Sequence, residues 1–336
     1  MKNIDIVTFG SAAWDVFMRP KKIRPVTSKR FVSKKGICFN LGSKVDIEDV
    51  YSSSGGGGTN TAATFVSQGF KTAFVGCVGN DLTGRQIIED LKVFGINVDF
   101  VQTESSRPTN YSVILKTQGV DRTILVYRGA SELFDKKRIP FGKIKKAKWF
   151  YLAPLPGKTA KITKDIVDFA EKNNIKVALN PGNSQLSLAK KEVEDIISKV
   201  DILVLNQEEA SFLTNIDYHK EKEIFKKIDN ICPGIAIMTK GPEGVSVSDG
   251  KHLFTAPGVH NNIVDNTGAG DAFGSGFVAG FIKKQDIEYA IQLAMTNSVS
   301  CLTKLGAKGG LLKKGQKFKK VKVSKEACLG HNCKVK

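Results

Sequence analysis

Short runs of apolar and β-branched residues alternate with amphipathic stretches along most of the chain. Near-continuous apolar character is typical of parallel strands that are covered on both faces. On this basis we predict strands at residues 4–9, 72–78, 148–152, 175–179, 201–205 and 235–239. The intervening stretches predict helices at residues 59–68, 82–94, 159–173, 192–199, 207–213, 271–283 and 287–304. This alternation predicts an α/β fold with a largely parallel central sheet covered by helices.

Two regions interrupt the alternation. Residues 19–54 are polar and basic before they become strand-like near Cys38, and residues 111–128 contain two strand-like runs joined by a turn at Gln118-Gly119. We predict that the two regions form a small separate β-sheet, which near a ligand site would be a lid. Exposed hairpins without a function would give the same pattern.

The charge of the chain is uneven. Lys and Arg number 51 against 33 Asp and Glu, and residues 304–336 alone contain eleven lysines and one glutamate. Only eight of the cations are Arg, the residue that best recognises bases and phosphates in a bidentate manner. We therefore interpret residues 311–336 as a solvated Lys-rich tail after a domain of residues 1–310, and favour this over a nucleic-acid-binding tail.

Several further features narrow the class of protein. No run approaches the roughly 18 to 20 apolar residues of a membrane-spanning helix, and Asp5 interrupts the first apolar run. We expect a cytoplasmic protein with no membrane partner and with reduced, mostly buried cysteines.

Cys328, His331 and Cys333 could share a metal ion, but a structural zinc site normally needs four ligands and no second cysteine pair follows.

A glycine-rich turn precedes the predicted helix at residues 271–283. The backbone N–H groups of Gly268, Ala269 and Gly270 could converge there on an anion, supported by the helix dipole. Asp271 would repel a bound phosphate unless it accepts the proton of an attacking nucleophile, which is what phosphoryl transfer to an alcohol requires. The alternative is an ordinary helix start in which Asp271 complements the dipole.

Two other phosphate-binding motifs are excluded by spacing. The chain contains no G-x-x-x-x-G-K-[ST] sequence, so the turn is not a Walker loop. Phe273 stands where a dinucleotide-binding fingerprint would have its third glycine.

Further polar clusters follow other strands. They are Asp15 after the first strand, Gly55–Gly58 with Asn60 at a helix start, Asn206 with Glu209, and Thr239-Lys240-Gly241. Ligands of open parallel sheets bind at the carboxyl ends of the strands, so we expect these clusters to gather at one site. Taken singly, Asn206 could be a helix cap, Glu209 a first-turn acid and Asp15 a turn cap.

The motifs resemble those of a known family. DNTGAGD at residues 265–271, and GG-x-x-x-N at Gly55, Gly56 and Asn60, are similar to the two signatures of the ribokinase-like, PfkB-type carbohydrate kinases. The resemblance extends from about Asp5 to Ala307. It implies a ribokinase-like three-layer fold with a small β lid, and an enzyme that transfers the γ-phosphoryl group of ATP to a hydroxymethyl group of a sugar.

The resemblance also implies roles for individual residues. Asp271 would be the general base, and Gly268, Ala269 and Gly270 the anion hole. The sugar hydroxyls would be held by Asp15, Gly55, Gly56 and Asn60. Asn206 and Glu209 would lie near the nucleotide phosphates and Mg²⁺, and Thr239 and Gly241 would line the nucleotide. Asp265 and the carbonyl of Thr267 would bind a monovalent cation such as K⁺, together with carbonyls near residues 303–306.

Some alternatives stay open at this stage. Ribose-specific relatives tend to carry a carboxylate where this chain has Ala153-Pro154, and Trp14 adjoins Asp15, so a nucleoside kinase of the same fold is the second hypothesis. From another class, the chain could bind an anionic surface or nucleic acid through its tail while the kinase fold is idle. A homodimer formed through the lid is a further expectation.

Overall fold

The computed structural model describes residues 4–21, 25–29, 31, 34–116, 122–259 and 263–327. The predicted turn at Gln118-Gly119 lies outside these residues, and so does the cluster of Cys328, His331 and Cys333. The four cysteines within them are free, with Cys38 exposed and the other three buried.

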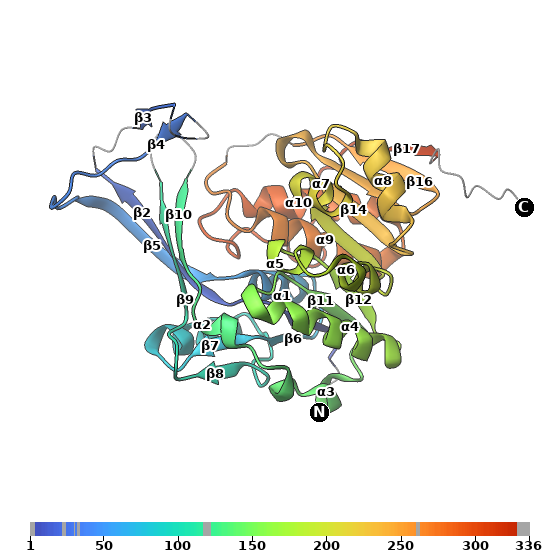
Figure 1. Cartoon of the computed structure of the whole chain (residues 1–336), viewed down its shortest axis with the longest axis horizontal. Helices are drawn as coiled ribbons and strands as arrows, with labels where there is room; N and C mark the ends of the chain where they lie inside the picture. The colour runs from blue at the N-terminus through green and yellow to red at the C-terminus, as the bar shows by residue number, and fades with distance from the viewer. Residues whose placement is uncertain are drawn as a thin grey trace, which may run out of the picture.

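A mixed sheet forms the centre of the molecule (Figure 1). Over the described residues its strand order is β17-β16-β15-β14-β13-β12-β11-β1-β6. The pairs from β6 to β14 are parallel, and those from β14 to β17 are antiparallel. The strands are β1 Ile6–Phe9, β6 Thr72–Val75, β11 Trp149–Leu152, β12 Lys176–Leu179, β13 Ile202–Asn206, β14 Ile235–Thr239, β15 Val245–Ser248, β16 His252–Ala256 and β17 Ser324–Ala327.

Helices cover both faces of this sheet, because alternate residues of each buried strand point to opposite faces. On β11, Phe150 and Leu152 belong to the core cluster under α4, α6, α7 and α8, whereas Trp149 and Tyr151 belong to the cluster under α1, α9 and α10. These helices are α1 Gly57–Ser67, α4 Ile162–Lys172, α6 Lys190–Ile197, α7 Gln207–Thr214, α8 Glu221–Asp229, α9 Ala269–Lys284 and α10 Ile287–Cys301. The shorter or peripheral helices are α2 Leu82–Val93, α3 Phe141–Ile144 and α5 Asn183–Leu186. The predicted α/β class with a largely parallel central sheet is confirmed.

Most predicted elements are present with shifted ends. The run at residues 72–78 is divided at Gly76, so that β6 joins the central sheet while β7 (Cys77–Gly79) pairs with β8 (Gln102–Glu104). The helix expected from residue 159 begins at Ile162 after a 3₁₀ turn, and the last helix ends at Cys301, three residues early. Helix α8 was not predicted, since only Ile224, Phe225 and Ile228 of its largely charged sequence are buried.

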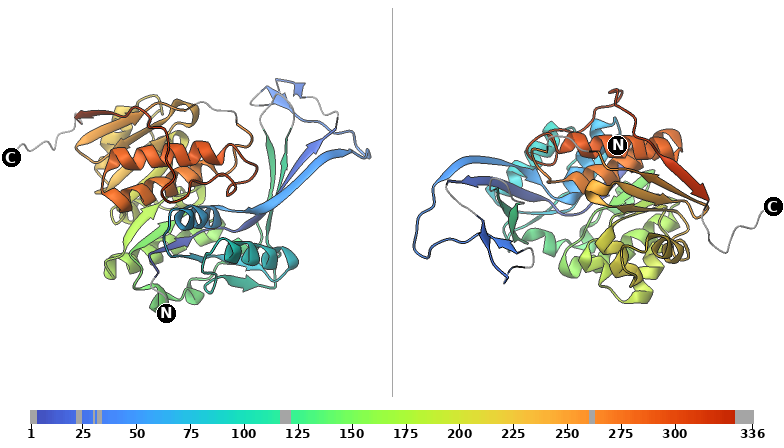
Figure 2. Two further views of the ribbon diagram at one scale, coloured as in Figure 1. Left: turned by 180° about the vertical axis from the view of Figure 1, so that it is seen from behind. Right: turned by 90° about the horizontal axis from the view of Figure 1, so that it is seen from above.

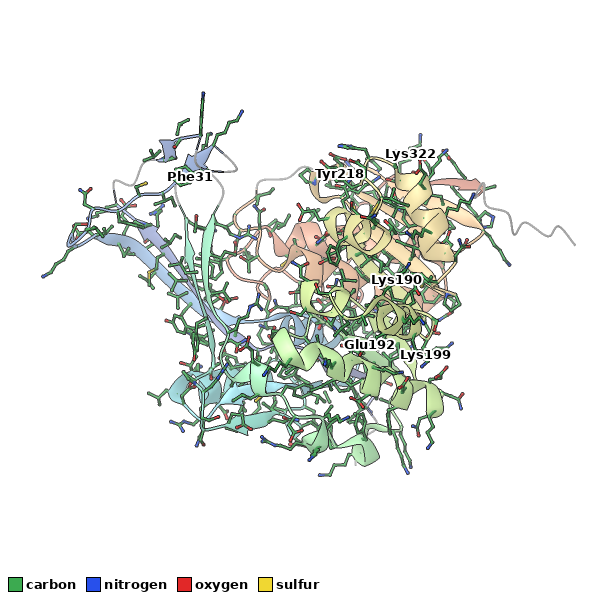
Figure 3. The ribbon with its side chains drawn as sticks, viewed as in Figure 1. Phe31, Lys190, Glu192, Lys199, Tyr218 and Lys322 are labelled. Atoms are coloured by element: carbon green, nitrogen blue, oxygen red, sulfur yellow. The ribbon has the colours of Figure 1, made fainter. Side chains whose placement is uncertain are left out.

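A second sheet projects from the body as the predicted lid (Figure 2). Its order is β10-β9-β2-β5 over the residues that the structure describes, from β2 Ala13–Pro20, β5 Ile47–Gly55, β9 Asn110–Leu115 and β10 Thr123–Tyr127. The lid therefore begins six residues before the predicted Arg19. A short hairpin of β3 (Val26–Thr27) and β4 (Lys35–Gly36) forms its outer end, where Phe31 lies (Figure 3).

Part of the predicted tail packs against the body. Leu311 and Leu312 are buried, and the Gln292 side chain bonds both the N–H and the carbonyl of Val321, at 2.6 Å each. Phe318 and Val323 also pack on the α9–α10 side of the core. Strand β17 then pairs with β16 at the sheet edge, near which Lys322 lies in Figure 3. Among the described residues, no helix is long and apolar enough to cross a bilayer.

Candidate active site

The glycine-rich turn forms the N-terminus of α9. Gly268 is the N-cap in the left-handed region with φ 78°, and no side chain caps the helix. A Cβ on Gly268 would lie 2.3 Å from Cβ of Ala307, so only glycine fits. The first N–H groups of a helix have no acceptor within the helix. A Cβ on exposed Gly270 would meet open space, so this turn can receive an anion.

Asp271, in the first turn of α9, meets the other signature of the sequence. The amide Nδ2 of Asn60 donates to Oδ2 of Asp271 at 2.8 Å. A Cβ on Gly57 would lie 3.4 Å from Oδ1 of Asp271, so the carboxylate faces the start of α1. The structure thus brings together two motifs that are 211 residues apart in the chain.

Lys308 completes this contact, although no sequence pattern predicted it. Its buried ammonium donates to Oδ1 of Asn60 at 2.9 Å and to the carbonyl of Ser54 at 2.6 Å. It is one of the eleven lysines of residues 304–336, although it lies before the predicted tail of residues 311–336. Its one distinguishing signal is its place among small residues, in the stretch GAKGG after α10.

Asp15 lies on lid strand β2 and is also buried. Its carboxylate packs on Gly55, where a Cβ would come within 1.9 Å of Oδ2 of Asp15, and it accepts a hydrogen bond from the Ser112 hydroxyl of β9. A Cβ on Gly56 would lie 2.5 Å from the carbonyl oxygen of Ser11. The glycines at the start of α1 therefore allow this close approach of lid and body.

Burial and one cation set the electrostatics of the site. Burial raises the pKa of Asp271, against the hydrogen bond from Asn60 and the charge of Lys308, and Asp15 raises it further. The Asp271 side chain keeps some solvent exposure although protein atoms surround it densely. Burial likewise raises the pKa of Asp15, while Ser112 and Lys308 oppose the rise. Burial lowers the pKa of Lys308 to about 8, although Asp15 and Asp271 favour its charged form.

Asn206 and Glu209 form a capping box at the start of α7. Oδ1 of Asn206 accepts from the N–H of Glu209 at 2.8 Å, and Oε2 of Glu209 accepts from the N–H of Asn206 at 2.9 Å. Asn206 is paired in register with Thr239 across β13 and β14, and Gly241 follows with φ 54° and open space at its Cβ position. Burial raises the pKa of Glu209, against the hydrogen bond from its cap.

The buried Tyr151 hydroxyl, which has no hydrogen-bond partner among the described residues, senses the charges of both helix starts. Burial raises the pKa of this phenol, and the negative charges of Asp271 and Glu209 both raise it further. The capped start of α7 and the open start of α9 therefore lie around the same buried side chain.

Asp265 and Thr267 organise the turn itself. Oδ1 of Asp265 accepts from the Thr267 N–H at 3.2 Å and from its hydroxyl at 2.9 Å, while Oδ2 accepts from the N–H of Gly306 at 3.0 Å. The thiol of Cys301 lies 3.7 Å from the Thr267 carbonyl and 3.5 Å from the Ala307 carbonyl. Within the described ranges, no cluster of three or more His, Cys, Asp and Glu residues could hold a metal ion.

Comparisons with known proteins show which proteins this chain is similar to. The family model described as pfkB family carbohydrate kinase matches residues 27–314. A ribokinase of Lactococcus lactis is 30% identical over 287 residues, which cover 84% of this chain and 90% of that protein.

Solved structures share the fold. A ribokinase of Arabidopsis thaliana, determined with ribose and ATP, superposes with a TM-score of 0.75 at 21% identity, covering 92% of this chain and 96% of that one. A nucleoside kinase of Methanocaldococcus jannaschii superposes with a TM-score of 0.72 at 18% identity, covering 92% and 95%. At these identities the likeness shows the fold, and it confirms the ribokinase-like architecture with its lid.

Proposed function

Since this chain belongs to the pfkB family of carbohydrate kinases, which transfer phosphoryl groups to alcohols, we propose that it phosphorylates a hydroxymethyl group of a sugar with ATP. One observation carries the proposal: the Asp271 carboxylate stands in the first turn of a helix whose N-terminus is uncapped. A base beside a phosphate site is the arrangement that phosphoryl transfer to an alcohol needs.

In the proposed reaction, Asp271 accepts the proton of the acceptor hydroxyl. The oxygen then forms a bond to the γ-phosphorus of ATP as the bond from that phosphorus to the β,γ-bridging oxygen breaks, and ADP leaves. The N–H groups of Gly268, Ala269 and Gly270 stabilise the charge on the transferred group. Asn60 holds Asp271 in place through its 2.8 Å bond.

The acceptor lies, in this proposal, between lid and body. The Asp15 carboxylate and the Asn60 amide would engage sugar hydroxyls, next to the backbone of Gly55 and Gly56. Lys308 donates to Oδ1 of Asn60, so it fixes the orientation of that amide and compensates the charges of Asp15 and Asp271. Ala153 is a small, apolar and fully buried residue behind this part of the site, where a Cβ on Gly57 would lie 3.1 Å from its Cβ.

We assign the nucleotide to the start of α7 and the end of β14, on the resemblance to kinases whose structures contain ATP or ADP. Thr239 and Gly241 would line it. Among the described residues no hydrogen bond reaches Oε1 of Glu209, which leaves this atom for water around a magnesium ion. When bound, Mg²⁺ neutralises phosphate charge during the transfer.

A nucleoside kinase is the second candidate for the same site. Ala153-Pro154, in place of the carboxylate of ribose-specific relatives, favours it. Against it, Trp14 is partly buried and packs on a core cluster with Ala12 and Phe74, which leaves less of its indole to stack on a base. We therefore keep the sugar as the first proposal.

The lid suggests an assembly. Strand β10 is exposed along its whole length, including Ile124, Leu125, Val126 and Tyr127, as are Val50 and Tyr51 on β5. We propose that a second copy of this chain covers these residues in a homodimer. Sedimentation equilibrium of the wild type and Leu125→Glu tests this, and a monomeric wild type would refute it.

The function is tested by a panel of pentoses, hexoses, sugar phosphates and nucleosides, with ADP release and the phosphorylated product measured together. We expect one group of sugars to give equal amounts of ADP and phosphomonoester, and Asp271→Asn to lower both by about 10² to 10⁴. Product only from nucleosides would favour the second candidate. A folded protein that phosphorylates no acceptor would support an idle kinase fold.

A further inference from the structure

A lysine of the lid reaches the turn behind the anion site. Lys116 directly follows β9, and its Nζ donates to the carbonyl of Val264 at 2.6 Å. The same Nζ lies 3.7 Å from Oδ1 of Asp265 and 5.8 Å from the ring centroid of Phe17. The Lys116 side chain is 27% exposed and that of Asp265 is 0% exposed. A lid cation and a fully buried carboxylate of the body therefore form an ion pair.

Several oxygen atoms around Asp265 are already engaged. Its carboxylate accepts the hydrogen bonds from Thr267 and Gly306 described above, and it also faces Lys116. The Val264 carbonyl accepts from Lys116, and the Thr267 carbonyl lies 3.7 Å from the Cys301 sulfur, whose single S–H is nearer the Ala307 carbonyl, at 3.5 Å. The Asp265 carboxylate is the charged group among the oxygen atoms that the resemblance assigns to a monovalent cation, and it already faces the Lys116 ammonium at 3.7 Å. A second, free cation does not fit this already paired carboxylate.

We propose that the ammonium of Lys116 supplies the positive charge at Asp265, so that phosphoryl transfer by this chain does not require a monovalent cation. An ammonium group carries the same charge as such a cation and donates to the same carbonyl and carboxylate oxygens. Asp265 ties Thr267, directly before Gly268, to Gly306, so a charge on Asp265 supports the conformation of the anion hole. Lys116 is thus a positioning residue, and the proposal rests on the function proposed above.

Lys116 also links the position of the lid to the anion hole. Because this lysine belongs to the lid, its ammonium reaches Asp265 only when the lid has the observed position relative to the body. The anion hole and the lid are therefore coupled through one ion pair.

The test compares the wild type with Lys116→Met, which keeps an apolar stem near Phe17 but has no charge. Turnover and melting temperature are measured in potassium, ammonium and choline chloride at equal ionic strength. We expect wild-type turnover to agree within about twofold across the three salts. Lys116→Met should lose about tenfold or more in choline, as expected for a charge-assisted hydrogen bond. Potassium or ammonium should restore part of that loss with saturation and raise the melting temperature of the variant alone.

Lys44→Met is the matched control, because Lys44 is an exposed lysine of the lid and its variant should behave as the wild type. Saturable potassium activation of the wild type would overturn the proposal, and so would a folded Lys116→Met that responds to no cation. Lys116→Gln gives the same comparison if the Met variant does not fold. If no acceptor is ever phosphorylated, the proposed function fails, while the melting temperatures still decide whether Lys116 replaces a cation.

Discussion

The starts of α7 and α9 make an instructive comparison, since both carry acidic residues in the first turn and both lie at the carboxyl-terminal edge of the sheet. At α7, Asn206 and Glu209 close a capping box on each other's backbone N–H groups. At α9, Gly268 provides no cap, and Asp271 bonds to Asn60 of another helix. The Glu209 carboxylate bonds to the N-terminus of its own helix. Asp271 instead lies beside N–H groups that no side chain caps, and these groups are available to a ligand.

The two helix starts also differ in the charges that surround their acidic residues. The raised pKa of Glu209 has burial as its main cause, opposed by the N–H of Asn206. For Asp271, a buried lysine opposes the rise in addition to an amide. A neighbouring cation stabilises the ionised form of a carboxylate, and a general base must be ionised to act.

The largest effect should come from Asp271→Asn. Asn keeps the shape of the side chain but cannot accept the proton, so turnover should fall by about 10² to 10⁴. The matched variant is Glu209→Gln, which keeps shape at the other helix start and should lose far less. Steady-state rates at saturating ATP and acceptor check this. A folded Asp271→Asn that retains more than about a tenth of wild-type turnover would contradict the role of base.

A smaller loss is expected for Gly268→Ala. The new Cβ would overlap Ala307 and strain a left-handed backbone, at a cost of about 1 to 3 kcal/mol in the free energy of unfolding. Displaced N–H groups should lower turnover by about 10²-fold. Gly270→Ala is the control for stability, because its Cβ meets open space. Equal stability of both variants, by chemical denaturation, would show that the turn is not constrained at Gly268.

Lys308→Met should change the pH dependence. The Lys308 charge lowers the pKa of Asp271, so its removal should move the rising limb of kcat/KM to higher pH. The pKa of Lys308 is about 8 in the folded protein and higher when unfolded, so the unfolded state binds more protons between these values. Wild-type stability should therefore gain a contribution as pH rises through that interval, and the variant should lack it. Superimposable pH profiles would exclude the role of Lys308.

The smallest effect on stability is expected for variants of Asn206, the N-cap of α7. Asn206→Ala should cost about 1 kcal/mol of stability, whereas Asn206→Ser, which can still cap, should cost less. If Asn206 only caps α7, ATP affinity of the Ser variant stays normal. If its amide also approaches the phosphates, as we propose, both variants lose ATP affinity, which calorimetry would detect.

The sequence predicted the elements whose signal is local. The parallel strands are apolar runs, and DNTGAGD and GG-x-x-x-N are each recognised from a short stretch of sequence. Strands β15 and β16 were not predicted, since VSVS and HLFTA interleave polar residues. Lys308 and Lys116 were missed for another reason: their partners lie 248 and 148 residues away, so no local pattern marks them. Four lysines are interspersed with Phe318, Val321 and Val323, so this segment contains no apolar run. The packing of residues 311–327 was therefore not predicted.

The central claim is that the open start of α9 binds the phosphoryl group while Asp271 acts only on the proton. Its most direct test is the equilibrium dissociation constant for ATP of Asp271→Asn and the wild type, measured by calorimetry. Removing a negative charge beside the phosphate site relieves repulsion, so affinity should hold or improve although turnover collapses. A dissociation constant that rises in proportion to the loss of turnover would contradict the claim, because Asp271 would then be needed to hold the site itself.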